Sequence, residues 1–184
     1  ALPICDGNDK RFRSNAFDKL DVFTEKQKNG DVLIHGLIKN KRVVRYINQK
    51  YLEPNITFEK YKVLLPQANG SGAIGEVLST PMVGEPMVGY TGSFIGIGAF
   101  DTKEEAEACM KYIKTKFARA MLGTLKITQH NEKATWQNVP LQDFTPQSDI
   151  DWSKSISEID KQLYAKYALS PEEVEFIEKN VKVM

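Results

Sequence analysis

The chain has 184 residues, 41% of them hydrophobic, and its 25 basic and 24 acidic side chains leave a net charge of +1. These values are typical of one folded domain and exclude a disordered tail, and no apolar run approaches the roughly 18 residues of a membrane span. Two cysteines, Cys5 and Cys109, and two histidines are too few for a disulfide framework or a zinc site, which favours a cytoplasmic location.

The chain begins with Ala1 rather than methionine. Its first five residues, ALPIC, contain neither a basic leader nor the apolar core of a signal peptide. We therefore expect the chain to be a fragment of a longer protein.

Residues 31–38 and 43–47 are short apolar runs rich in β-branched side chains, and Lys39, Asn40 and Lys41 separate them. This pattern predicts two strands joined by a tight turn, a hairpin with a basic tip. Residues 39–50 contain five basic and no acidic side chains. Such a stretch can bind phosphates, although an ordinary solvated surface is the competing interpretation, which charge alone favours.

Residues 61–65 form another predicted strand, which Pro66 ends, and residues 93–100 form a third. From residue 67 to residue 98, eight glycines and two prolines exclude long helices. Residues 70–75 match the pattern G-x-G-x-x-G of dinucleotide sites, but the helix and the acidic residue that such a site requires do not follow. A glycine loop can instead bring backbone N–H groups close to a phosphate or a base edge.

The second half of the chain is predicted to be helical. Asp101 and Glu104 have the spacing of a capping box, and apolar residues then recur at helical spacing as far as Gly123. This indicates one long amphipathic helix, with Cys109 packed beside its apolar stripe. Residues 111–126 again hold five basic and no acidic side chains, and Lys116 and Arg119 are expected to point away from the stripe.

Two further helices are predicted near the end of the chain, one starting within residues 149–153 and one at Ser170 and Pro171. We expect them to form a helical pair over residues 151–184, packed on an α+β domain of residues 1–150 or docking to a catalytic domain. The predicted fold class is therefore α+β, with a mixed or antiparallel sheet, a glycine-rich loop region, one long amphipathic helix and a C-terminal helical pair.

Catalytic motifs are incomplete throughout. Residues 94–98 resemble the glycine turn of S-adenosylmethionine-dependent methyltransferases, but the chain has no Pro-Pro pair for the turn that receives a flipped base. Asp101 and Lys103 have the spacing of a nuclease motif, yet they fall where a helix cap is predicted. We expect no catalytic residue, cofactor site or metal ligand in this chain.

An ordered series of short segments carries a family resemblance: residues 105–107, 112–119, 126–129, 136, 139–140, 143–145, 149–152, 158–160, 163–167 and 176–178. In order and spacing it resembles the C-terminal region of bacterial restriction–modification proteins of the adenine-specific methyltransferase class, including fused endonuclease–methylases. The resemblance is strongest from about residue 60 onward. It implies that this chain is the target-recognition, or specificity, domain. The catalytic methyltransferase would then lie N-terminal to this chain in the parent polypeptide. The resemblance implies that the parent protein uses S-adenosylmethionine, and Mg²⁺ is a second candidate cofactor for it.

The resulting hypothesis is sequence-specific recognition of double-stranded DNA, with no chemistry in this chain. The residues expected to bind phosphates are Lys41, Arg42, Lys116, Arg119 and Lys126. The residues expected to read base edges are Asn69, Ser71 and Gln129. The expected partners are duplex DNA and the N-terminal domains of the parent protein. We expect no association with a membrane. The alternative is a protein–protein docking module of a multidomain enzyme.

Overall fold

A computed structural model of the chain describes residues 12–53, 55–68, 73–128, 130–131 and 133–184. The strands are β1 (Asp31–Ile38), β2 (Lys41–Asn48), β3 (Tyr61–Pro66), β4 (Met82–Gly84), β5 (Val88–Tyr90) and β6 (Phe94–Phe100). The helices are α1 (Ala16–Lys19), α2 (Lys103–Lys114), α3 (Lys116–Gly123), α4 (Ile156–Lys166) and α5 (Pro171–Asn180), with 3₁₀ turns η1 (Gln49–Tyr51) and η2 (Lys133–Trp136). The strands come first and most of the helices follow, which confirms the α+β class.

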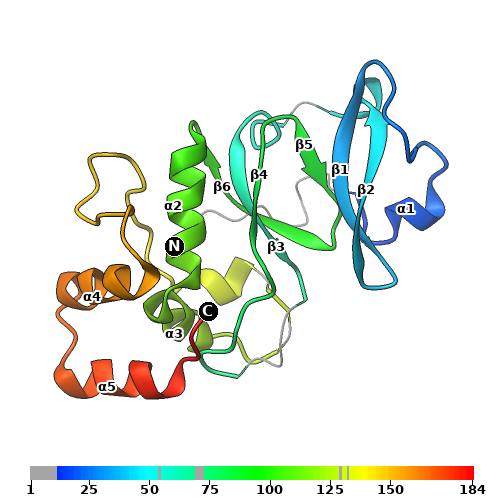
Figure 1. Cartoon of the computed structure of the whole chain (residues 1–184). Coiled ribbons are helices and arrows are strands. Elements are labelled where there is room, and N and C mark those ends of the chain that lie inside the picture. Colours follow the sequence, from blue (N-terminus) through cyan, green and yellow to red (C-terminus); the bar gives the residue numbers. More distant parts are fainter. Residues whose placement is uncertain (1–11, 54, 69–72, 129, 132) are drawn as a thin grey trace.

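The strands form two separate three-stranded sheets, with the orders β2-β1-β5 and β4-β3-β6. The first sheet is mixed, because β1 is antiparallel to β2 and parallel to β5. The second sheet is antiparallel, and α2 packs against its strands. Figure 1 shows the first sheet at one end of the molecule and α4 and α5 at the other, with the second sheet and α2 between them.

The β1–β2 hairpin is confirmed, and its turn consists of two residues, Lys39 and Asn40. Both have positive φ, 48° and 60°, as a type I′ turn requires, and Ile38 pairs with Lys41 across the strands. One face of the hairpin covers a small core, because alternate residues of β1 are buried. That core consists of Val32, Ile34 and Ile47 with Phe12, Phe17, Phe23, Leu52 and Phe58 packed around them.

A second, larger core joins the rest of the molecule. It includes Val63 and Ile97 from the β4-β3-β6 sheet, together with Tyr112 and Phe117 from α2 and α3. The C-terminal helices contribute to the same cluster, with Ile159, Leu163 and Ile177. Helices α4 and α5 are therefore packed on the body of the fold.

The single helix predicted to run to Gly123 is in fact two helices. Thr115 lies between them with an extended ψ of 152°, and its hydroxyl group accepts a hydrogen bond from the N–H of Ala118 at 3.1 Å. The carboxylate of Asp160 in α4 accepts two more, from the N–H groups of Lys116 at 3.0 Å and Phe117 at 2.9 Å. These side chains satisfy the first N–H groups of α3, while the apolar periodicity continues across the break and conceals it from the sequence pattern.

The helix starts follow local capping chemistry, with two corrections. Helix α5 begins at Pro171 after Ser170 in a full capping box, as predicted. The N-cap of α2 is Thr102 rather than Asp101, and its hydroxyl group accepts from the N–H of Glu105 at 3.2 Å. Helix α4 begins only after Ser155, which forms a capping box with Glu158. Residues 149–153, where that helix was predicted to start, lie in the preceding loop.

Candidate nucleic-acid interface

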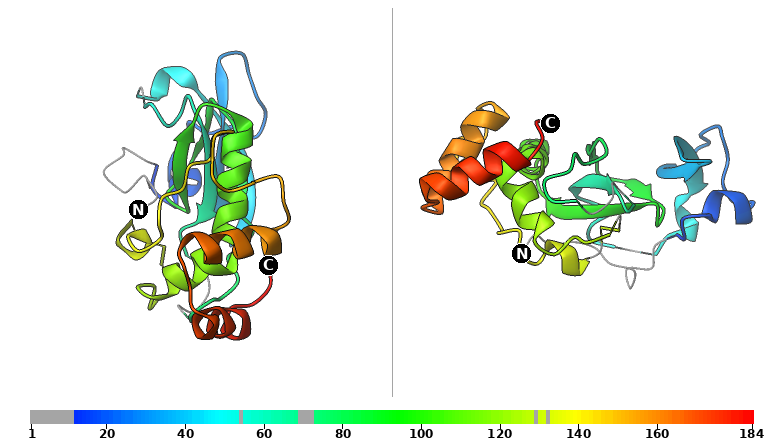
Figure 2. Two further views of the ribbon diagram at one scale, coloured as in Figure 1. Left: turned by 90° about the vertical axis from the view of Figure 1, so that its left-hand side faces the viewer. Right: turned by 90° about the horizontal axis from the view of Figure 1, so that it is seen from below.

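The described residues among the eight predicted to contact DNA do not gather on one surface. Asn69, Ser71 and Gln129, the predicted base readers, lie outside the described residues. The remaining five divide between the hairpin, with Lys41 and Arg42, and α3 with the segment after it. Figures 1 and 2 show the hairpin and α3 well separated, because the β4-β3-β6 sheet lies between them. The two basic stretches therefore do not form a common face.

Arg119 points into the protein, not away from it as predicted. Its side chain is buried, and its guanidinium group donates to five backbone carbonyl groups, those of Lys114, Thr115, Gly75, Glu76 and Lys182, at 2.5 to 3.4 Å. Burial is also the main reason that its pKa is lowered from the usual value. Arg119 thereby ties α3 to the loop that precedes β4 and to the C-terminal segment.

Glycine is required at one point of this junction. Gly75 has a φ of +66°, and a Cβ atom there would lie 2.7 Å from the Cα atom of Val181. The C-terminal segment can therefore approach the loop closely enough for the N–H of Lys182 to donate to the carbonyl of Gly75 at 3.3 Å. Arg119 reaches carbonyl groups on both segments because they are this close.

Lys116 and Lys126 also have partners inside the molecule. The ammonium group of Lys126 is buried, pairs with the carboxylate of Glu76, and donates to the carbonyl of Thr128 at 3.0 Å. Lys116 pairs with the carboxylate of Glu178 in α5, and its ammonium group lowers the pKa of that carboxyl group. Both lysines therefore hold distant segments together, so they do not present the cationic surface expected of a phosphate site.

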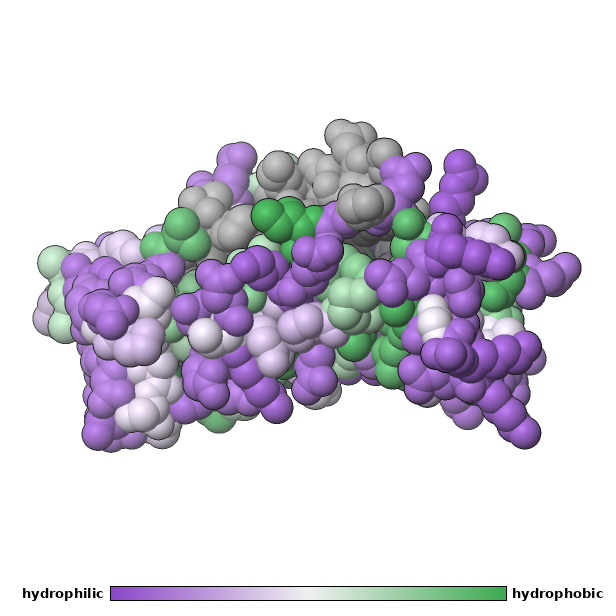
Figure 3. Space-filling model, turned by 90° about the horizontal axis from the view of Figure 1, so that it is seen from above, coloured by the Kyte–Doolittle hydropathy of each residue, from purple (hydrophilic) through white to green (hydrophobic). Residues whose placement is uncertain are grey.

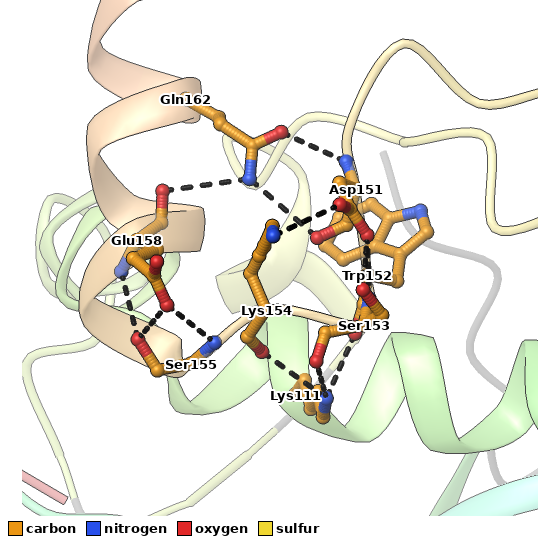
Figure 4. Close-up of polar contacts among 8 residues, drawn as sticks. All are labelled: Lys111, Asp151, Trp152, Ser153, Lys154, Ser155, Glu158 and Gln162. Carbon is orange, nitrogen blue, oxygen red and sulfur yellow. Dashed lines mark hydrogen bonds and ion pairs between the residues drawn. The ribbon is translucent and has the colours of Figure 1, made fainter.

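Lys111, on the same basic stretch, is used in a similar way (Figure 4). Its ammonium group donates to the carbonyl groups of Trp152, Ser153 and Lys154 at 2.8, 3.3 and 3.2 Å. These carbonyls converge because the chain turns just before α4. The basic stretch of residues 111–126 thus contains four cations that stabilise tertiary contacts.

The hairpin presents its cations differently. Lys39 and Lys41 flank Asn40 at the tip, all three side chains are exposed, and neither lysine makes a hydrogen bond or an ion pair with any residue that the structure describes. Arg42 is exposed as well, but its guanidinium group donates to the carbonyl of Thr80 and lies 5.6 Å from the centre of the Phe94 ring. Arg42 therefore links the two sheets, whereas the lysines of the tip are available to a ligand.

Net charge differs between the hairpin end of the molecule and the rest of the chain. Residues 12–53, which we call the hairpin unit, contain nine basic and five acidic side chains, a net charge of +4, so the rest of the chain carries −3. Hydrophilic side chains project from the end of the molecule that holds this unit (Figure 3). A phosphate backbone would consequently be attracted to the hairpin end.

The body of the fold carries a groove of opposite charge. It has a volume of about 890 Å³ and lies between α2 and the loop of residues 144–153, with Phe144 and Trp152 in its wall. Five carboxylates line it: Glu104, Glu105, Glu107, Asp149 and Asp151. Among the described lining residues the positive charge belongs to Lys111, whose ammonium group already contacts three carbonyls. This groove would repel DNA and suits a cationic group.

A further buried cation links the connections between the two sheets. Lys62 in β3 is 1% exposed, and its ammonium group donates to the carbonyls of Thr57, Phe58, Lys60 and Glu85 at 3.1 to 3.2 Å. Residues 57–60 follow the first sheet, and Glu85 lies in the crossing from β4 back to it. Lys62 thus ties together two of the connections that orient the hairpin unit.

Two candidate reactive groups, His35 and Cys109, are partly or fully buried. His35 in β1 is half-buried, and burial, then the charges of Arg42 and Lys62, lower its pKa below the usual 6.5, which favours the neutral imidazole. Burial raises the pKa of the Cys109 thiol, which makes it a packing residue. No group of three or more metal-ligating side chains occurs among the residues searched, which are those that the structure describes. None of the described helices combines the length and apolar character of a membrane span.

Comparison with family models, with curated proteins and with solved structures found no match for this chain.

The sequence pattern had indicated a basic hairpin tip without placing Lys39 among the contact residues. The register that pairs Ile38 with Lys41 leaves Lys39 and Asn40 as the turn, so both side chains project from the end of the ribbon. The short spacing between the two β-branched apolar runs, which favours a two-residue turn, is the signal that could have identified them.

Proposed function

We propose that this chain binds double-stranded DNA through the β1–β2 hairpin, as the specificity domain of a restriction–modification enzyme. The observation that carries the proposal is where positive charge is available to a ligand. The hairpin unit has a net charge of +4 and exposed lysines at its tip, whereas four of the five cations of residues 111–126 are engaged with other parts of the protein. The resemblance of the sequence to restriction–modification proteins supplies the enzyme class.

A two-stranded ribbon has the width to enter the major groove of DNA, which is about 12 Å across. Lys39 and Lys41 would contact phosphates on either side of the tip and fix its position without reading sequence. Contacts of this kind supply binding energy that an enzyme needs when it flips its target base out of the helix. The methyl donor and any metal would be bound by the catalytic domains of the parent polypeptide, in the bacterial cytoplasm.

Salt dependence of duplex binding tests the proposal. Fluorescence anisotropy with a labelled random-sequence duplex, measured from 20 to 200 mM salt, gives the slope of log affinity against log salt concentration. Because each phosphate contact contributes about 0.9 to that slope, the double variant Lys39→Gln, Lys41→Gln should reduce its magnitude by about 2. The matched control, Lys161→Gln with Lys179→Gln, changes two exposed lysines of α4 and α5 and should leave the slope unchanged.

Equal slopes for the tip variant and the control would contradict DNA binding through the hairpin. A chain that does not bind duplex at 20 mM salt would contradict DNA binding altogether. Docking of a cationic partner in the groove beside α2 would then be the interpretation that the charge distribution favours.

A further inference from the structure

The hairpin turn carries side chains that its backbone does not favour. Type I′ turns favour glycine, above all at the second central position, because both central residues have positive φ. Here that position is Asn40, with a φ of 60°, and the first is Lys39, with a φ of 48°. Asparagine tolerates this region better than most residues, but glycine would adopt it without a Cβ penalty. The conformation of the turn alone therefore does not explain why a side chain is present at residue 40.

The Asn40 amide is available to a ligand. The side chain is exposed at the tip, and it makes no hydrogen bond with any residue that the structure describes. It offers one acceptor oxygen and two donor hydrogens on one planar group. Exposed lysines on both sides give the position a favourable potential for nucleic acid.

The arginines and the other asparagine of the hairpin are already engaged. Within residues 31–48, all of which are described, Arg42 donates to the carbonyl of Thr80. Arg45 pairs with Glu25 at 2.9 Å, and the side chain of Asn48 accepts from the N–H of Lys50 at 3.2 Å. Of the arginines and asparagines in residues 31–48, Asn40 is the one whose side chain remains free to form a bidentate pair with a base.

We infer that Asn40 is a specificity-determining residue, whose amide pairs with a base edge in the major groove while Lys39 and Lys41 hold the adjacent phosphates. Adenine is the best match, because its N7 acceptor and N6 amino group complement the donor and acceptor of an asparagine amide. The inference rests on the proposed DNA binding. It assigns base recognition to a residue that the structure describes.

Selection from a duplex library tests it. The 184-residue chain and its variants are each used to enrich a duplex library with a random central segment, at fixed low salt. The wild-type chain should enrich a motif containing an A·T pair. Asn40→Gly should lose about tenfold or more of the preference at that one position, retain the rest of the motif, and bind non-specific duplex as before.

Three comparisons separate the possible outcomes. Lys41→Gln should weaken binding to all sequences alike without changing the motif, and Asn29→Gly, at the opposite end of the hairpin, should change neither. Thermal unfolding of Asn40→Gly should occur at the same or a higher temperature, because glycine relieves the positive φ, so its loss of preference would not come from misfolding.

An Asn40→Gly variant that enriches the full motif at wild-type strength would overturn the role of Asn40 while leaving DNA binding intact. A wild-type chain that binds duplex in a salt-dependent manner but enriches no motif would overturn sequence reading by this chain, and the role of Asn40 with it. A wild-type chain that does not bind duplex would overturn the proposed function as well.

Discussion

Backbone carbonyl groups hold the buried cations of this protein. Lys62 and Arg119 are almost fully buried, and each donates to four or five carbonyl oxygens; the ammonium group of Lys111 contacts three more. A buried charge is stable when several hydrogen bonds replace its hydration, and carbonyls outside regular structure need donors in return. These residues therefore stabilise loops and connections between strands whose carbonyl groups are not paired within a helix or a sheet.

Replacing Arg119 tests this role. In Arg119→Met the side chain stays long and becomes apolar, and five carbonyl groups lose a hydrogen bond to the guanidinium group, although those of Gly75 and Thr115 keep a backbone N–H donor. The free energy of unfolding should therefore fall by about 3 kcal/mol. Urea denaturation followed by circular dichroism measures the change. Lys161→Met, at an exposed site of α4, should stay within about 0.5 kcal/mol of the wild type. A similarly small effect at Arg119 would show that its contacts contribute little.

At the scale of elements, the junction between α2 and α3 depends on a side chain from elsewhere in the chain. Asp160 is buried in α4 and accepts from the first two N–H groups of α3, at 3.0 and 2.9 Å. Burial is the main reason that the pKa of Asp160 is raised, whereas the two hydrogen bonds oppose that shift. The contact therefore fixes the angle between α2 and α3 and docks α4 against both helices.

Two substitutions at residue 160 should separate the stabilisation due to its capping hydrogen bonds from the effect of its buried charge. Asp160→Ala removes both acceptors and should lower the free energy of unfolding by about 2 kcal/mol. Asp160→Asn retains an amide oxygen that can accept from one N–H and carries no buried charge, so its loss should be roughly half as large. Chemical denaturation measures both values. If Asp160→Asn destabilises as much as Asp160→Ala, the charge rather than the hydrogen bonds is what matters.

At the scale of the whole molecule, two cores of unequal size lie side by side. The hairpin unit buries three aliphatic side chains with a ring of partly buried aromatic residues, whereas the larger core includes residues from four helices and two strands. Because stability follows the apolar area that is buried, the hairpin end should open more readily. This end is also the one proposed to contact DNA, where local adjustment assists binding.

Native-state hydrogen exchange tests this difference. Amides of β1 and β2 should exchange with a smaller opening free energy than those of β3, β6 and α2, because their opening exposes only the smaller core. Mass spectrometry of peptides from residues 31–48 and 94–114 would compare the two groups directly. Equal protection would mean that Lys62 and Arg42 couple the sheets so tightly that they open as one unit.

Elements set by neighbouring residues were predictable. The hairpin follows from two short apolar runs separated by polar residues 39–41, and α5 follows from Ser170, Pro171 and Glu173 in a capping box. The break at Thr115 was not predictable, because its second capping partner, Asp160, is 45 positions away and the apolar stripe continues through it. Of the candidate site, the basic tip was predictable, whereas the positions of Asn69, Ser71 and Gln129 lie outside the described residues.

The sequence by itself determined the α+β class, the hairpin and the start of α5, because turns, caps and side-chain alternation act between residues within a few positions of each other. Only the tertiary structure decided which cations face solvent. Lys116, Arg119 and Lys126 have partners that lie 43 to 63 positions away in the sequence, so no local pattern distinguishes them from Lys39 and Lys41. Burial and long-range carbonyl and carboxylate contacts convert one basic stretch into internal support and leave the other at the surface.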